Sequence, residues 1–383
     1  MTSAVLKKQH APSQFGYINL LKAVAAQLIV LHHLAFYGPM ADYVRPVFPD
    51  LIGWLGDSAR IAVQVFLVIG GFLAAKSLSP AGLPSHASPL GAIWHRYTKL
   101  APPFIAATLV AAAASALASR WMVHDSISDP ATLAQLAAHA VLLHGVLDYP
   151  SLSAGAWYVA IDFQLYAALV LLLWLAGVLV GKHVVRWLMP LLVAVGITMS
   201  LLHFNLDAEW DSWAPYFFGS YGLGLMAWWG SDPARKPGAT TLIMLAALLP
   251  ALAGLVLEFR SRIALALVVA SVLFVCGRIR TASNGNAWTA INKLGKISYS
   301  VFLIHFPVCL LVNAAFTRFV DPEPELQMLG MLLAWSTSLL AGAAFHRWVE
   351  LPLSRAVQFV SHKIDTRDWL KPDSGRAGVV TLR

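Results

Sequence analysis

The sequence predicts an all-α protein, a polytopic bundle of about ten transmembrane helices. Of its 383 residues, 58% are hydrophobic and only 12% are charged. A soluble domain carries roughly 25% charged residues, so a soluble fold of this composition would lack the charge to cover its surface. The apolar runs are continuous over about 20 residues instead of alternating, which favours helical spans over the strands of a membrane barrel.

Ten apolar segments have the length of a membrane-spanning helix. The first follows Lys7 and Lys8 and exceeds the apolar core of a cleaved signal sequence, so we expect it to be retained. The expected organisation is a transmembrane domain over residues 1–353 and a polar cytoplasmic tail over 354–383. In chain order, the expected spans are 16–38, 58–78, 100–119, 157–181, 184–203, 213–229, 240–257, 261–279, 297–319 and 327–348.

One further apolar segment, residues 131–147, is ambiguous. If it crossed the membrane, Lys182 and Arg186 would face outward, against the usual excess of basic residues on the cytoplasmic side. We therefore expect a helix that lies in the outer interface or re-enters it. This arrangement places His139 and His144 on the outer side.

Basic residues orient the whole chain. With the N-terminus inside, all but six of the 27 Lys and Arg residues fall on cytoplasmic segments. The alternation predicts that both termini are cytoplasmic, and it explains the net charge of +8 by topology instead of nucleic acid binding. The six outside are Arg45, Arg60, Arg120, Arg260, Arg262 and Arg318.

The first span carries three ionisable residues at membrane depth, where such residues are costly and are candidates for function. Lys22 and His33 are eleven positions apart, which is three helical turns plus about 20°, so they share one helix face. His32 points about 100° away from that face. An imidazole on the Lys22 face is suited to take a proton near neutral pH. The alternative is a snorkelling lysine beside two histidines that bond backbone carbonyls.

Three further groups of polar residues stand out. Arg96 and Lys99 are three positions apart at the start of a span, and they can hold phosphates or act as ordinary cytoplasmic anchors. Asp162 is a carboxylate inside a span, so it needs a histidine, a cation or a sugar hydroxyl as a partner. The alternative is that its negative charge is compensated, weakly, by the positive end of its own helix dipole. His305 precedes the helix-kinking Pro307 within a span. It can either take a direct part in function or be a hydrogen-bonded histidine that only packs between helices.

These segments together resemble the acyltransferase-3 family of bacterial integral-membrane acyltransferases. The family pattern of Arg, ten residues and then His is similar to the first span, with Lys22 in place of arginine and His33 at the catalytic histidine. Its R-x-x-R motif is similar to Arg96 through Lys99. The other similar segments are 65–73 with Gly70 where serine is usual, 157–166 with Asp162 for glutamate, 298–307, and 350–352.

Two kinds of departure from the family pattern change the expected contacts. Lysine at positions 22 and 99 keeps the positive charge but loses the bidentate fork of arginine. Asp162 is one methylene shorter than glutamate, so its partner must lie closer. In the absence of an extracytoplasmic hydrolase-like domain, the chain resembles the stand-alone members of the family.

The resemblance implies O-acyl transfer, with acetyl expected, from acyl-CoA to a hydroxyl of an exopolysaccharide, lipopolysaccharide or oligosaccharide. It implies that His33 is the general base or carries the acyl group briefly. The implied residues are His33, Asp162 and His305 for catalysis, Lys22, Arg96 and Lys99 for the donor, and Trp157, Tyr158 and Tyr166 for the acceptor.

The expected location is the bacterial inner membrane. The expected partners are the lipid bilayer, a carbohydrate acceptor and proteins of polysaccharide synthesis or export, with no metal and no nucleic acid. One alternative is a transporter or flippase in which buried His and Asp relay protons, although the repeated halves typical of transporters are not found. A second is a non-catalytic membrane partner in a polysaccharide synthesis complex. A third is a membrane acyltransferase of a different class that uses a protein or lipid acceptor.

Overall fold

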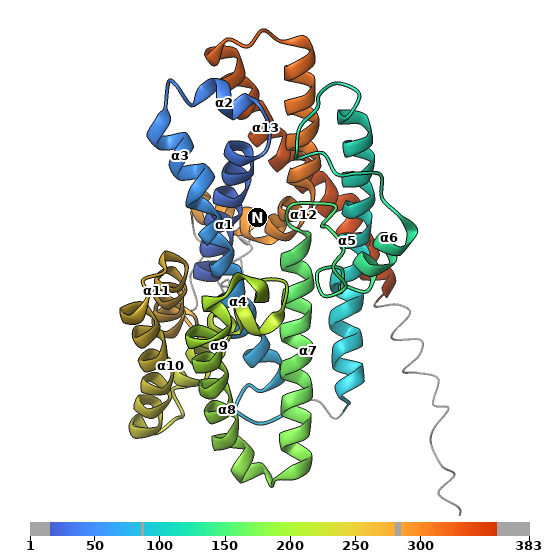
Figure 1. Ribbon diagram of the computed structural model, residues 1–383. Coiled ribbons are helices and arrows are strands. Elements are labelled where there is room, and N and C mark those ends of the chain that lie inside the picture. Colours follow the sequence, from blue (N-terminus) through green and yellow to red (C-terminus); the bar gives the residue numbers. More distant parts are fainter. Residues whose placement is uncertain (1–15, 86–87, 280–284, 358–383) are drawn as a thin grey trace, which may run out of the picture.

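The computed structural model describes residues 16–85, 88–279 and 285–357, and every regular element in these ranges is helical (Figure 1). The prediction of an all-α bundle is therefore confirmed. Each of the ten expected spans coincides with a helix. These helices are α1 (Gly16–Phe36), α4 (Val63–Leu78), α5 (Pro89–Ala118), α7 (Ala156–Leu179), α8 (Lys182–Leu202), α9 (Ala214–Gly230), α10 (Pro237–Leu257), α11 (Ser261–Cys276), α12 (Asn286–Phe319) and α13 (Pro324–Phe345).

Eight segments in the described ranges are long and apolar enough to cross a membrane. One of them joins the 3-10 turn Ala59–Ala62 to α4. The remaining two expected spans, α9 and α11, have only 17 and 16 residues. In the described ranges, eight segments are therefore long enough to cross the membrane, and the two shorter helices pack in the same bundle.

The segment expected to stay at the outer interface forms only a short helix. This is α6 (Leu133–Ala140), which has eight residues and is followed by turns, so it is too short to span. Two other short helices, α2 (Met40–Val44) and α3 (Pro49–Asp57), connect α1 to α4. Most of the expected cytoplasmic tail, residues 358–383, lies outside the described residues.

Helix starts follow local sequence signals. Proline occupies an early position of α3, α5, α9, α10 and α13, where its missing N–H costs no helical hydrogen bond. Ser88 caps α5 by accepting a hydrogen bond from the Gly91 N–H, and Thr132 caps α6 in the same way from Gln135. Of these helices, α5 carries Arg96 and Lys99.

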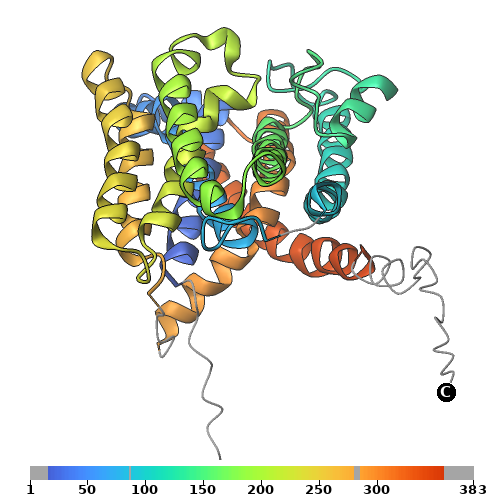
Figure 2. The same cartoon turned by 90° about the horizontal axis from the view of Figure 1, so that it is seen from below.

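The helices of the bundle form two groups, and the long helix α5 contacts both. Helix α12 packs against α1 and α13, and α9 packs against α4, α8, α10 and α11. Helix α5 contacts both α12 and α7, and Figure 1 shows it running along both groups. Seen from below in Figure 2, α10 and α11 lie at one edge and α5 lies at the other.

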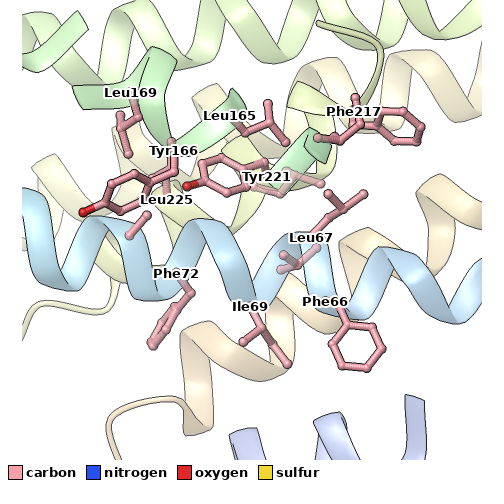
Figure 3. Packing of buried hydrophobic residues seen from close by; sticks show 14 of the residues in the cluster. Phe66, Leu67, Ile69, Phe72, Leu165, Tyr166, Leu169, Phe217, Tyr221 and Leu225 are labelled. Atoms are coloured by element: carbon pink, nitrogen blue, oxygen red, sulfur yellow. The ribbon is translucent and has the colours of Figure 1, made fainter. Parts of the chain in front are cut away.

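Helices α4 and α9 cross closely at two glycines. A Cβ on Gly71 would overlap the backbone carbonyl of Tyr221, and a Cβ on Gly224 would overlap that of Val68. Small residues let helix backbones approach closely in membranes, where dispersion contacts replace the hydrophobic drive. The crossing holds Tyr221 against α4. Figure 3 shows Tyr221 on the opposite side of that helix from Phe66.

We predict that Gly71→Ala destabilises the folded protein by about 1–3 kcal/mol or more, because overpacking forces two backbones apart. The measurement is thermal unfolding in detergent micelles. Gly53→Ala is the matched control, since a Cβ there meets nothing within 4 Å and alanine favours helix. Equal unfolding midpoints for the two variants would contradict the close crossing.

The distribution of basic residues predicts that both termini are cytoplasmic. Reporter fusions at Arg383 and within residues 205–211, the acidic connection between α8 and α9, are expected to report opposite sides of the membrane. Matching signals from the two positions would overturn the orientation.

Candidate active site

Two histidines from distant parts of the chain meet inside the bundle. His33 of α1 and His305 of α12 are both buried, and His33 Nδ1 lies 2.6 Å from His305 Nε2. His305 Nδ1 lies 3.1 Å from the carbonyl oxygen of Val301, which only accepts hydrogen bonds. For neutral rings, His305 therefore carries its proton on Nδ1 and accepts from His33 Nδ1. This leaves the lone pair of His33 on Nε2.

His33 borders a cavity of about 980 Å³. Its Nε2 makes no hydrogen bond within the described residues, so it is free to meet a ligand there. The wall combines polar groups such as Gln64 and Arg262 with the aromatic ring of Trp157. Of the three residues expected to bind the acceptor, Trp157 lines this cavity and Tyr158 and Tyr166 do not.

The structure gives His32 and His33 different partners, as their positions around the helix predict. His32 turns away from His305 and places its Nδ1 2.9 Å from the carbonyl oxygen of Leu55 in α3. Its role is thus to tie α1 to the short helix that follows it. The two adjacent imidazoles have different partners, which makes His32 a natural control for His33.

Gln64 is a cavity residue that the sequence reasoning missed. Ser220 of α9 donates a hydrogen bond to Gln64 Oε1, so the amide orientation is set and its NH2 group remains without a partner among the described residues. An uncharged glutamine in an apolar run carries little signal by itself. Its position directly before the family-like segment 65–73 is the available hint.

An aromatic cluster connects the histidine pair to the charged residues. Phe302 lies 6.1 Å from His305, 5.2 Å from Tyr158 and 6.0 Å from Phe66, measured between ring centroids. Tyr158 in turn interacts electrostatically with Asp162. Phe302 and Tyr158 thus link the ring of His305 to the neighbourhood of Asp162.

Arg96 of α5 and Asp162 of α7 form an ion pair, with Arg96 Nη2 2.5 Å from Asp162 Oδ2. The guanidinium also lies 5.1 Å from the ring centroid of Tyr166. A Cβ on Gly70 would lie only 2.9 Å from Asp162 Oδ1, so a bulkier residue there would press on the carboxylate. Asp162 therefore contacts a cation, and no hydrogen bond links it to either histidine.

The two lysines expected to bind the donor belong to the same charged region. Lys22 is half-buried and interacts electrostatically with Lys99, Arg96 and Asp162, and Lys99 is exposed. Asp162 is the carboxylate near Lys22 and Arg96, and Glu350 is the one near Lys99, so three cations face two carboxylates. This excess of positive charge suits an anionic ligand.

The closing segment of the bundle is tied to α12. Glu350 accepts hydrogen bonds from Ser300 and, at 2.9 Å, from His346. Tyr299 donates to the carbonyl oxygen of Leu100, which joins α12 to α5. These contacts brace the helix that carries His305.

A family model described as an acyltransferase domain, Acyl_transf_3, matches residues 15–346. The chain belongs to the acyltransferase-3 family. The match covers all the expected site residues and favours an acyltransferase over a transporter. No curated protein and no solved structure matched the chain significantly.

The acyltransferase thus brings its expected site residues together in two groups. His33 and His305 form one, and Lys22, Arg96, Lys99 and Asp162 form the other. Among the described residues, no cluster of three or more His, Cys, Asp or Glu side chains is arranged to hold a metal ion.

Two more histidines of the acyltransferase stack beside the cavity, in and after α6. The rings of His139 and His144 lie 4.0 Å apart. His139 is satisfied by the Gln135 carbonyl and the Leu152 N–H, whereas both nitrogens of His144 are enclosed without a partner in the described ranges. Burial, with His139 beside it, lowers the pKa of His144 to about 3.

This burial predicts that the acyltransferase loses stability as the pH falls from about 6.5 toward 3. In that window the unfolded chain protonates His144 and the folded chain does not, so acid favours unfolding. The loss approaches about 1.4 kcal/mol per pH unit for one such group. Thermal unfolding between pH 7.5 and 4.5 is expected to decline less steeply for His144→Asn. An unchanged pH dependence in that variant would refute this assignment.

Proposed function

We propose that this acyltransferase moves an acyl group, acetyl in the first instance, from acyl-CoA to a carbohydrate hydroxyl. The observation that carries the proposal is the His33–His305 pair, which leaves His33 Nε2 unpaired at the wall of the cavity. A neutral imidazole with a free, oriented nitrogen is suited to general base catalysis.

In the proposed reaction, His33 Nε2 takes the proton of the acceptor hydroxyl while the oxygen attacks the thioester carbonyl. The carbon–sulfur bond breaks, and the leaving thiolate takes that proton back from the imidazolium. The products are an ester and free coenzyme A. During the step, His33 Nδ1–H donates to His305 Nε2, which holds the ring in place and favours its charged form.

The donor is proposed to bind on the side of Lys22, Arg96 and Lys99. Coenzyme A carries phosphates, and these cations outnumber the carboxylates beside them. Asp162 then serves chiefly to hold Arg96 in position, because the two side chains form an ion pair. The cytoplasmic orientation expected for this end of the bundle agrees with a cytoplasmic donor.

The acceptor is proposed to bind in the cavity beside His33. The polar wall supplies hydrogen-bonding groups for hydroxyls, and Trp157 supplies an aromatic face for a sugar ring. A carbohydrate of the bacterial surface, such as an exopolysaccharide or lipopolysaccharide, would meet the cavity from the outer side of the inner membrane. Proteins of polysaccharide synthesis or export remain proposed partners.

We predict that His33→Ala lowers acyl transfer by about 10²- to 10⁴-fold, the usual effect of removing a general base. His32→Ala is expected to keep most of the activity, since His32 also borders the cavity but is bonded to the Leu55 carbonyl and makes no hydrogen bond to His305. The assay follows label passing from acyl-CoA to carbohydrate in membranes, normalised to folded protein.

Full activity in His33→Ala would remove the catalytic assignment. Equal and complete loss in both variants would show that the helical phase does not separate the two roles.

A further inference from the structure

An arginine outside the candidate active site is buried with most of its charge unpaired. Arg235 lies in the connection after α9 and is only 7% exposed. Its Nε donates to the Trp229 carbonyl at 3.0 Å, whereas Nη1 and Nη2 are enclosed with no partner in the part of the chain that the structure describes. Buried charged donors are rarely left unsatisfied, so this one demands an explanation.

Two further guanidinium groups lie beside it. Arg235 interacts electrostatically with Arg186 of α8 and with Arg278 after α11, and the nearby acid is Asp232. Arg278 donates to Ser231 Oγ and to a backbone carbonyl. Since Arg186 is exposed, the cluster reaches the surface of the protein. Three cations against one carboxylate leave an excess of positive charge.

The connection after α4 contributes another unsatisfied donor. Ser79 Oγ is fully buried without a partner in the described ranges, and the Ser79 carbonyl accepts from Trp229 Nε1 at 2.9 Å. A Cβ built on Gly82 would lie 3.8 Å from Arg235 Nη2 and 3.5 Å from Arg186 Cγ. The turn around Gly82, where φ is +81°, therefore lies directly against the arginines.

We propose that Arg235 and Ser79 bind a phosphate group, with Arg186 and Arg278 adding positive charge around it. The unsatisfied groups of Arg235 are donors only, and the Ser79 hydroxyl has a proton to give, so their partner must be an acceptor. Phosphate oxygens match the planar fork of arginine, and a negative ligand offsets the excess charge.

Two sources can bring a phosphate to this end of the bundle. One is the 3′-phosphate of coenzyme A, which lies far from the thioester; this source rests on the proposed function. The contacts favour coenzyme A as the source. Arg96 packs on the ring of Tyr166, and the Tyr166 hydroxyl meets the hydroxyl of Ser77. Ser77 in turn lies two positions before Ser79. The other source is the headgroup of an anionic phospholipid at the cytoplasmic surface.

The test compares wild type, Arg235→Gln and a matched control, Lys236→Ala, which removes the adjacent but exposed charge. Equilibrium binding is measured for coenzyme A and for 3′-dephospho-coenzyme A. Thermal unfolding is measured with phosphatidylglycerol and with diacylglycerol, which lacks the phosphate. Lys236→Ala is expected to behave as wild type in both assays.

A 3′-phosphate ligand predicts that Arg235→Gln binds coenzyme A at least about tenfold more weakly. Wild type would then bind the dephospho form as weakly as the variant does. A lipid ligand predicts unchanged coenzyme binding and loss of the extra stability that phosphatidylglycerol gives over diacylglycerol. Either result supports the phosphate site.

The proposal is overturned if Arg235→Gln matches wild type in both assays. If Arg235→Gln does not fold, Ser79→Ala and the ligand comparison on wild type decide the question. Equal binding of the two coenzymes and equal stabilisation by the two lipids would then reject it. If no form of coenzyme A binds, the proposed donor fails, while the lipid comparison still tests the phosphate site.

Discussion

The ion pair between Arg96 and Asp162 is the interaction on which the inner part of the site depends. A charge in a low-dielectric bundle is tolerated only with a partner, and removing one member leaves the other uncompensated. The pair ties α5 to α7, and it places the guanidinium on the ring of Tyr166. Gly70 makes room for the carboxylate beside it, so the close packing of α4 and the position of the ion pair are linked.

The histidine pair and the ion pair divide the site by chemistry. His33 and His305 are held without a counter-charge in hydrogen-bonding contact, which suits imidazoles that stay neutral until a proton is transferred. The cations lie beyond Phe302 and Tyr158. Under the proposed function, an anionic donor and a neutral hydroxyl acceptor would bind in these two separate environments.

The sequence was sufficient for the fold class and for the positions of the ten helices, because continuous apolar runs are local signals. It also separated His33 from His32, since helical phase follows directly from spacing. It did not predict that His33 would meet His305, 272 positions away, because the packing of α1 on α12 is a tertiary contact.

Other features depend on contacts that no local pattern encodes. Sequence reasoning placed Asp162 among the catalytic residues, and the structure pairs it with Arg96, which that reasoning had assigned to the donor. The orientation of Gln64 depends on Ser220, and the unpaired state of Arg235 depends on what surrounds it. In the sequence alone, Gln64 is an ordinary glutamine and Arg235 is one of many arginines in a connection between helices.

In the proposed function, the donor and the acceptor approach His33 from opposite sides of the membrane. The direct measurement uses everted inner-membrane vesicles that expose the cytoplasmic face, with the carbohydrate acceptor enclosed and labelled acyl-CoA added outside. The account predicts that the enclosed acceptor becomes labelled. Labelling that occurs only when acceptor and acyl-CoA are on the same side would contradict it.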